Sequence, residues 1–328
     1  MKRLLILLIL LASLSSLLLS NVVGKKPAAS EAAPIWPERI VHQASGIALV
    51  FIPGGEFQMG SPAMEIDRSS MERPHRRLVR QPFYMGETEV TVEQFRKFVQ
   101  ETGYVTDAER GVEEAGRYGK GAFASTTQGD RQWNPSANWR NPFPNLKQYK
   151  LNDNHPVVQI SWADAQQFVE HYGLRLPTEA QWEYAARAGS RTRFFWGNSE
   201  EQGKGFGNVA DKSGHKRFPN WNLFFPFDDG TSLLADVAQY KANPWKLYDI
   251  VGNVSEWCQD SFTKDYPPDG TDETPVLGDK NSLRVLRGGS WLDAPDSQRS
   301  AKRLGSAPHS RRDSVGFRVV LKIGSEAQ

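Results

Sequence analysis

The segment that decides the fold is Arg175-Leu176-Pro177-Thr178-Glu179-Ala180-Gln181-Trp182-Glu183-Tyr184-Ala185. Thr178 and Gln181 have the spacing of a capping box, in which each side chain accepts a hydrogen bond from the backbone N–H of the other residue. Pro177 precedes this cap, and the apolar residues after it continue toward Gly189, a residue type that commonly ends helices. The segment therefore predicts a short helix with a marked start and a marked end.

Two further helices have boundaries of the same kind. One begins at the box Thr91-Val92-Glu93-Gln94 and ends at Gly103, and the other begins at Ser161 and ends at Gly173. Short apolar runs between turn residues predict strands at 47–51, 57–59, 78–84, 87–90, 282–286 and 315–321. Residues 111–144 predict a polar surface loop, and the chain after 190 predicts long ordered loops, which are usually functional or held by ions.

Composition limits the functions open to this chain. Among its 328 residues, 40 are Lys or Arg and 38 are Asp or Glu, so no bulk charge would attract nucleic acid. The single cysteine, Cys258, excludes an internal disulfide, and the loops must therefore be ordered by packing or by metal ions. The 10 Trp and 28 Gly indicate short elements joined by tight turns, with large aromatic side chains between them.

The N-terminus has the pattern of a secretory signal. Met1-Lys2-Arg3 is basic, and an apolar run extends from Leu4 to Leu19. We expect cleavage near Gly24 and export to the periplasm; the alternative is an uncleaved inner-membrane anchor facing the periplasm, which would be the only contact with a membrane. The predicted organisation is a signal peptide or anchor at 1–24, a Pro- and Ala-rich linker at 25–44, a domain at 45–323 and a tail at 324–328.

Seven blocks, in order along the chain, resemble those of the formylglycine-generating enzyme or sulfatase-modifying factor family. They are Phe51–Gly60, Glu87–Thr91, His155–Val158, Arg175–Ala185, Gly252–Trp257, Arg287–Trp291 and Gly316–Arg318. The family also includes ergothioneine-type synthases and the pyoverdine-maturation protein PvdO. The resemblance implies an α+β domain of C-type-lectin-like descent, with little regular secondary structure and long ordered loops.

The loop after Gly288-Gly289 departs from the chemistry of that family, in which two cysteine thiolates after a Gly-Gly-Ser block hold copper(I). Here Asp293 stands at the first cysteine position, and the second falls within Pro295 to Gln298, so no copper is expected. The resemblance leaves Ser290, Trp291 and Asp293 as catalytic candidates, and Arg299, Arg303 and Arg318 as substrate-binding candidates. Structural alternatives stay open: a turn hydrogen bond for the serine and an ion pair for the last arginine.

The resemblance also implies two structural calcium sites. The first would use the carboxylates of Asp249 and Glu256 with the carbonyls of Gly252 and Val254, and the second Asn208, the Val209 carbonyl, Asp229 and the Thr231 carbonyl. Calcium prefers such oxygen ligands, and the alternative is that these are solvated turn residues. No iron is expected, because no two of the six histidines have helical ligand spacing. Cys258 is expected to be a buried small hydrophobe.

Three functions remain for such a chain. The first is a periplasmic maturation enzyme that acts without cysteines on a peptide or a peptide-derived small molecule, as the resemblance to PvdO implies for a siderophore. The second is a non-catalytic binding module that presents loops to a peptide, glycan or protein. The third, formylglycine generation, is disfavoured by the missing thiolates. A buried pocket with Asp293 and an unpaired arginine would favour the enzyme, and a flat surface the binding module.

Overall fold

The three capped helices form where the sequence predicts them. Helix α4 spans Glu179–Arg187 and begins at Thr178. Helix α1 spans Val92–Thr102 and is followed by Gly103, whose φ of 67° is left-handed. Helix α3 spans Trp162–His171. All three contain both hydrogen bonds of the capping box, which confirms the helix starts predicted from residue spacing.

The computed structural model describes residues 36–112, 119–268 and 270–323. The signal peptide or anchor predicted at 1–24 and the tail at 324–328 lie outside them. Among the described residues, the apolar content and length of every helix fall short of what a membrane span requires. Strand β1, Arg39–Val41, pairs with the strand after it, so ordered structure starts before Ser45, inside the stretch predicted as a linker.

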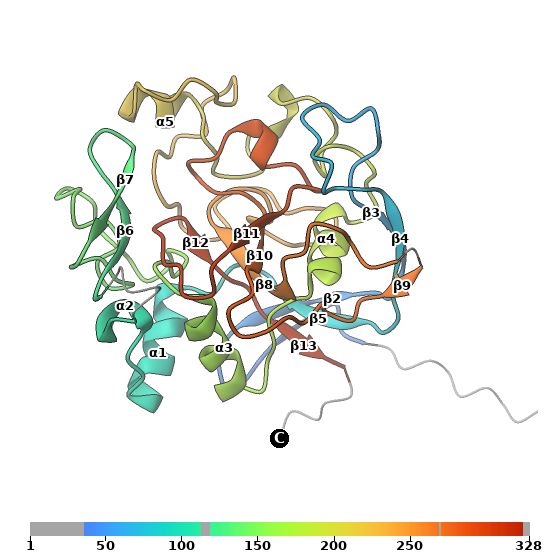
Figure 1. The fold of residues 1–328 in the computed structure, drawn as a ribbon, viewed down its shortest axis with the longest axis horizontal. Helices are drawn as coiled ribbons and strands as arrows, with labels where there is room; N and C mark the ends of the chain where they lie inside the picture. Colours follow the sequence, from blue (N-terminus) through green and yellow to red (C-terminus); the bar gives the residue numbers. More distant parts are fainter. Residues whose placement is uncertain (1–35, 113–118, 269, 324–328) are drawn as a thin grey trace, which may run out of the picture. The chain divides into compact units, whose positions relative to one another are not determined.

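Short strands form four small sheets in the described part of the chain (Figure 1). Their orders are β1-β2-β5-β13, β11-β10-β8-β12, β3-β4-β9 and β6-β7. The remaining strands are β2 Ala48–Ile52, β3 Gly55–Met59, β4 His75–Val79, β5 Phe83–Gly86, β6 Ala122–Ser125, β7 Arg131–Asn134, β8 Ser255–Ser261, β9 Thr271–Asp272, β10 Arg284–Arg287, β11 Leu304–Ser306, β12 Val315–Gly316 and β13 Val320–Lys322. The shorter helices are α2 Asp107–Arg110, α5 Lys212–Arg217, and the 3-10 turns η1 Glu201–Gly203 and η2 Pro295–Ser297. The fold is therefore sheet-rich and low in helix, as expected.

Four of the predicted segments differ from the structure. The strand predicted at 315–321 is divided between β12 and β13, which belong to different sheets. The strand predicted at 78–84 is divided between β4 and β5, because the chain passes from one sheet to another just before Pro82, which has no N–H for a ladder. Residues 87–90 leave the sheet, and the N–H of Val90 donates to Phe317 O. The surface loop predicted at 111–144 contains the hairpin β6-β7 and buries Trp139 and Phe143. The polar composition of this segment did not indicate the hairpin.

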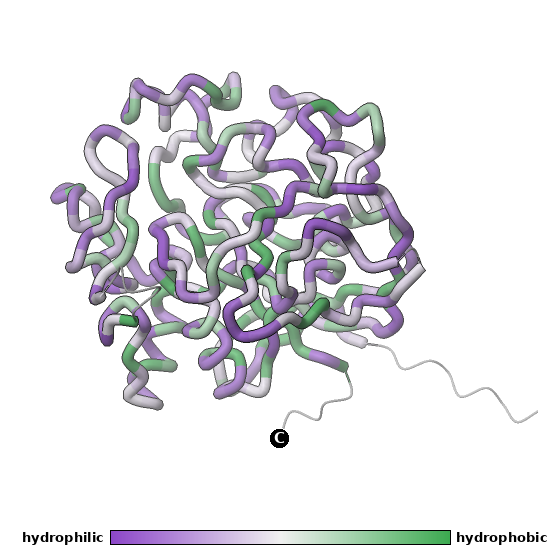
Figure 2. Tube along the Cα trace, viewed as in Figure 1, coloured by the Kyte–Doolittle hydropathy of each residue, from purple (hydrophilic) through white to green (hydrophobic). Residues whose placement is uncertain are grey.

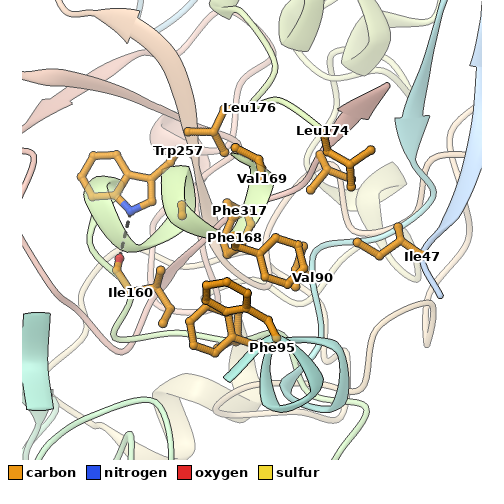
Figure 3. Close-up of a cluster of buried hydrophobic side chains, with 14 of the residues drawn as sticks. Ile47, Val90, Phe95, Ile160, Phe168, Val169, Leu174, Leu176, Trp257 and Phe317 are labelled. Carbon is orange, nitrogen blue, oxygen red and sulfur yellow. Dashed lines mark hydrogen bonds between the residues drawn. The ribbon is translucent and has the colours of Figure 1, made fainter. Parts of the chain in front are cut away.

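The largest hydrophobic cluster lies where α1 and α3 meet strand residues from both ends of the chain (Figure 3). The rings of Phe95 and Phe168 stack with centroids 5.9 Å apart, and Phe317 meets Phe168 edge-on at 5.3 Å. Trp257 closes one side and donates from Nε1 to Ile160 O at 3.0 Å (Figure 3). Aromatic side chains thus fill the space between short elements, as the composition indicated.

Helix α4 carries a fully buried carboxylate, Glu183. It accepts hydrogen bonds from Gly60 N at 2.8 Å and Arg187 Nε at 2.8 Å, and it pairs with Arg287 of β10. Burial acts to raise the pKa of Glu183, but the two guanidinium charges and the hydrogen bonds outweigh it and leave the pKa lowered. The carboxylate is therefore ionised and holds β3, α4 and β10 together.

Glu183→Gln is expected to lower the free energy of unfolding by about 3–5 kcal/mol, because it leaves buried guanidinium groups without their counter-charge. Chemical denaturation at neutral pH, followed by tryptophan fluorescence, measures this loss. The control is Glu170→Gln, which removes an exposed carboxylate of α3 and should change the free energy by less than about 0.5 kcal/mol. Equal effects of both substitutions would contradict a stabilising role for the buried pair.

Candidate functional site

The chain reverses direction directly after β10, at Gly288 and Gly289. Their φ values of 95° and 69° lie in the left-handed region, which glycine adopts without a steric cost. A Cβ on Gly289 would lie 2.5 Å from Gln298 Oε1, so only glycine allows this close approach. The Gln298 amide donates to the carbonyls of Ser290 at 2.7 Å and Asp293 at 3.1 Å. The segment 290–299, called the site loop below, is thus held in shape by hydrogen bonds from one of its own side chains.

Asp293 is half-buried at the turn of the site loop. Ser290 Oγ donates to Asp293 Oδ2 at 2.5 Å, which is the turn hydrogen bond that the sequence left open for this serine. Desolvation raises the pKa of Asp293 above its usual value, against the Ser290 hydrogen bond and the charge of Arg131. A reachable carboxyl with a raised pKa is suited to proton transfer.

A second acid and an arginine lie near this loop, and sequence reasoning missed both. Asp313 is fully buried; its Oδ2 accepts from Ser125 N at 2.6 Å, and its Oδ1 has no donor. Burial raises the pKa of Asp313 to about 6, although the charge of Arg131 acts in the opposite direction. The Arg131 guanidinium, from β7, donates to Ser314 Oγ at 3.0 Å. Its charge thus acts on both acids.

Arg131 makes no ion pair with a carboxylate of the described residues. Its one side-chain hydrogen bond goes to the hydroxyl of a serine. The residue is half-buried, so its guanidinium charge is only partly screened by solvent. A half-buried guanidinium that makes no direct ion pair can hold a carboxylate or phosphate in a bidentate contact. Arg131 is therefore the arginine of this region that remains open to an anionic group.

Trp291 supports the site loop from the core. It is 1% exposed, and its Nε1 donates to Asp313 O at 3.3 Å. Its ring lies 5.9 Å from that of Phe143 and 6.1 Å from that of half-buried Trp221. Trp291, named from the sequence as a catalytic candidate, therefore holds the site loop against the segment before β12 that carries Asp313. Trp221 provides an aromatic wall nearer the solvent.

The three arginines predicted to bind substrate are all buried in ion pairs. Arg299 pairs with Glu72 at 2.7 Å and with Glu65 at 2.8 Å. Arg303 pairs with Glu179 at 2.6 Å. Arg318 pairs with Glu256 at 2.7 Å, which agrees with the structural alternative named for it. Each guanidinium already has its counter-charge, so a substrate anion would have to displace a carboxylate from the core.

The predicted calcium ligands lie in turns that are close to each other, and all but Asp229 and Thr231, which are half-buried, are buried. Gly252 has a φ of 84°, and a Cβ there would collide with the carbonyl of Asn208. Asn208 Oδ1 and Asp249 Oδ1 are buried and have no hydrogen-bond donor. Such orphaned oxygens are costly unless a cation or water satisfies them. One ligand of each predicted set therefore fits a bound calcium ion.

The other predicted carboxylate ligands already accept hydrogen bonds from protein groups. Both oxygens of Glu256 accept hydrogen bonds, from Arg318 and from Trp182 Nε1 at 2.7 Å. The carboxylate of Asp229 accepts from Val209 N at 2.9 Å and Thr231 N at 2.8 Å. Among the described residues, no group of three or more His, Cys, Asp or Glu side chains is placed to hold a metal by itself. Calcium would depend on the carbonyls of Gly252, Val254, Val209 and Thr231.

Glu89 adds a carboxylate to the first of these turns, and no local sequence pattern predicted it. It is 1% exposed, and neither of its oxygens has a donor. Burial raises its pKa, and the negative charges of Asp249 and Glu256 raise it further, while Arg318 opposes them. Three carboxylates share one guanidinium here, so protons or a divalent cation must supply the missing positive charge.

Cys258 and the histidines have structural surroundings. Cys258 is fully buried in the second hydrophobic cluster, and burial raises the pKa of its thiol well above the usual value. It is therefore a protonated core residue rather than a thiolate. His155 Nδ1 lies 2.9 Å from Tyr149 Oη, and burial lowers the pKa of His155. The ring of His75 is tilted by 36° against that of Tyr266, with centroids 4.4 Å apart.

The sequence of this chain is similar to those of known proteins. Residues 38–323 match a family model described as the sulfatase-modifying factor enzyme 1-like domain. The chain is 36% identical to a formylglycine-generating enzyme of Streptomyces coelicolor over 321 residues, which covers 92% of this chain and 99% of that one. It is 32% identical to the inactive C-alpha-formylglycine-generating enzyme 2 of Mus musculus over 313 residues, covering 88% and 90% of the two chains.

A solved structure shares the fold. The structure of PvdO from Pseudomonas aeruginosa superimposes with a TM-score of 0.67 and covers 88% of this chain and all of that one. The two sequences are 24% identical, so the likeness shows the fold alone. It confirms the sheet-rich, helix-poor architecture expected from the sequence.

Proposed function

The chain belongs to the sulfatase-modifying factor enzyme 1-like domain family, and from this premise we propose that it is an exported enzyme that modifies a peptide or a peptide-derived molecule without using paired cysteines. The observation that carries the proposal is the half-buried Asp293 carboxyl, on which the charge of Arg131 acts although Arg131 makes no direct ion pair with a carboxylate of the described residues. That combination provides one group for proton transfer and one for holding an anion. Export rests on the basic and apolar N-terminal sequence.

The donor atoms of the site loop argue against a copper-thiolate centre. Copper(I) is a soft ion that selects sulfur ligands. The site loop offers the hydroxyl of Ser290, the carboxylate of Asp293 and the amide of Gln298, and the one cysteine of the chain lies in the core. Formylglycine generation through two thiolates therefore lacks its ligands in this chain.

The roles we assign follow from the contacts. Ser290 holds one oxygen of Asp293, so that the other can receive or return a proton. Arg131 would hold a carboxylate of the substrate, and Trp291 and Asp313 keep the site loop and β6 in place. A siderophore precursor of the pyoverdine type is the first substrate to test, as the resemblance implies. Its oxidation would also require an external electron acceptor, in the simplest case dioxygen.

A second function, a non-catalytic accessory module in the periplasm, is favoured by one observation. A relative 32% identical to this chain carries the word inactive in its name. In that case the loops would bind a peptide or protein and Asp293 would only order the site loop. The two functions differ in the effect expected of Asp293→Asn. If the variant still folds, an enzyme should lose its product, whereas an accessory module should be unaffected.

Asp293→Asn is expected to reduce product formation by at least about 100-fold, because general acid–base groups contribute factors of this size. A deletion strain complemented with the wild type or the variant, compared by untargeted metabolite profiling with attention to siderophore chromophores, measures this loss. Asp296→Asn is the matched control in the same loop, because Asp296 is half-buried and lies 3.7 Å from Lys302, and it should retain activity. Full activity of both variants would exclude Asp293 from the chemistry.

The purified protein is expected to leave a sulfatase-type Cys peptide unchanged, with or without added copper, because the required thiolate pair is missing. Mass spectrometry of the peptide detects the loss of sulfur that accompanies formylglycine formation. The S. coelicolor relative serves as the positive control under the same conditions. Catalytic turnover by this chain would contradict the proposal.

We also propose structural calcium in the two turns that carry Asp249 and Asp229, which rests on the orphaned oxygens described above. Burial raises the pKa of Asp249 to about 6 and that of Asp229 to about 7, from a usual value of 3.8. Without a cation, the folded state therefore loses stability as pH rises through these values and the carboxyls ionise. Calcium binds the ionised form and would remove this loss.

Calcium added to the EDTA-treated protein is therefore expected to raise Tm, and the increase should grow as pH is raised from about 5 to 8. Differential scanning calorimetry across this range measures it, with magnesium as the ion control. Asp229→Asn should reduce the increase, whereas Asp228→Asn, which changes an exposed neighbour, should not. An increase that is independent of pH, or equal with magnesium, would contradict the calcium sites.

A further inference from the structure

Two segments of the chain contain basic residues and no acidic residue at all. In residues 131–152 the basic residues are Arg131, Arg140, Lys147 and Lys150, and in residues 212–227 they are Lys212, Lys216 and Arg217. The chain as a whole is nearly balanced, with 40 Lys or Arg against 38 Asp or Glu, so this separation of charge is local. A local excess of one sign attracts ligands of the opposite sign.

Aromatic side chains of both segments meet at Trp291 of the site loop. The Trp291 ring lies 5.9 Å from that of Phe143, which belongs to the first segment. It also lies 6.2 Å from the ring of Phe218 and 6.1 Å from that of Trp221, which belong to the second. Both acid-free segments are therefore packed against the loop that carries Asp293.

The cations lie at the surface, directly beside the residues that pack in this cluster. Leu146 and Phe218 are buried in the same hydrophobic cluster as Trp291. Their neighbours in sequence, Lys147 and Arg217, are exposed, and the Arg217 guanidinium lies 5.6 Å from the centroid of the Phe218 ring. Helix α5 and strand β7, one from each segment, are on the same side of the molecule (Figure 1), and both are coloured mostly hydrophilic (Figure 2).

Most of these cations are not neutralised. Five are exposed and make no ion pair with any of the described residues: Lys147, Lys150, Lys212, Lys216 and Arg217. Arg140 pairs with Glu109 at 3.2 Å.

The carboxylates that border the two segments are fewer. Asp130 and Asp228 are exposed, and Asp236 is half-exposed and lies 3.5 Å from His155 Nε2. Asp153 and Asp296 already pair with Arg96 and Lys302, at 2.6 and 3.7 Å. A ligand at this surface therefore meets five unpaired cations and, at most, three exposed or half-exposed carboxylates without a Lys or Arg partner.

We propose that the substrate of the site loop is an acidic peptide, with carboxylates before and after the reacting residue that bind the lysines and the arginine of the two segments. An extended chain can contact both segments while its reacting residue reaches Asp293, whereas a single small anion would occupy only one of them. The inference rests on the proposed function for the reaction at Asp293. The binding of the peptide itself requires no turnover.

The test measures the fluorescence anisotropy of short labelled peptides on addition of the full chain. The peptides alternate Gly with Glu, with Gln or with Lys. The Glu peptide should bind at low ionic strength and lose affinity as salt is added, because contacts between exposed charges are screened. The Gln and Lys peptides should bind at least about 10-fold more weakly.

Asp293→Asn separates this inference from the proposed reaction, because it should bind the Glu peptide no more weakly than the wild type. Binding of the Glu peptide by a chain that forms no product would leave the inference standing and contradict the reaction. Product formation by a chain that does not bind the Glu peptide would contradict the inference alone.

Lys147→Gln with Lys216→Gln, one change in each segment, should weaken binding of the Glu peptide about 5-fold, as expected for the loss of two exposed ion pairs. Lys264→Gln with Lys280→Gln removes the same charge at exposed positions outside the two segments and should leave the affinity unchanged. Equal affinities for the three peptides, or equal effects of the two double variants, would overturn the proposal. Equally tight binding of single-stranded DNA or of phosphatidylglycerol vesicles, with the same loss in the first double variant, would also overturn it, because the face would then bind polyanions in general.

Discussion

The ion pair between Arg287 and Glu183 is the contact on which the rest of this structure depends. Both side chains are fully buried, one at the end of β10 and the other on α4. Removal of either would leave an isolated charge in the core, which costs several kcal/mol. Because the reversal at Gly288 follows directly after Arg287, the position of α4 decides where the site loop lies.

Buried arginine–carboxylate pairs recur around this centre and explain a misreading of the sequence. Arg299, Arg303 and Arg318 were expected near a substrate because they follow the Gly-Gly-Ser block. The structure uses each of them to join distant segments: 65–72 to the site loop, α4 to the chain before β11, and β8 to the chain before β13. A sequence shows that an arginine is present but not whether a glutamate from a remote segment already neutralises it.

What could be predicted is local. Capping boxes at Thr91, Ser161 and Thr178 depend on spacings of a few residues, and all three helices start there. The Ser290–Asp293 contact spans three residues and lies within the segment chosen from the sequence. Arg131 and Asp313 were missed because β7 and the segment before β12 meet only through tertiary packing. The same holds for Glu89, whose burial beside Asp249 has no local sequence signal.

The site loop thus presents oxygen and nitrogen donors, among them the carboxyl that we propose for proton transfer, where related enzymes are expected to carry two thiolates. Competition for copper(I) tests this claim most directly: the purified chain is titrated against a copper(I) chelator, with Cys258→Ser and Asp293→Asn in parallel. We predict that the chelator takes all the copper from all three proteins. Tight binding of one copper(I) per chain, lost on substitution within the site loop, would contradict the cysteine-independent chemistry proposed here.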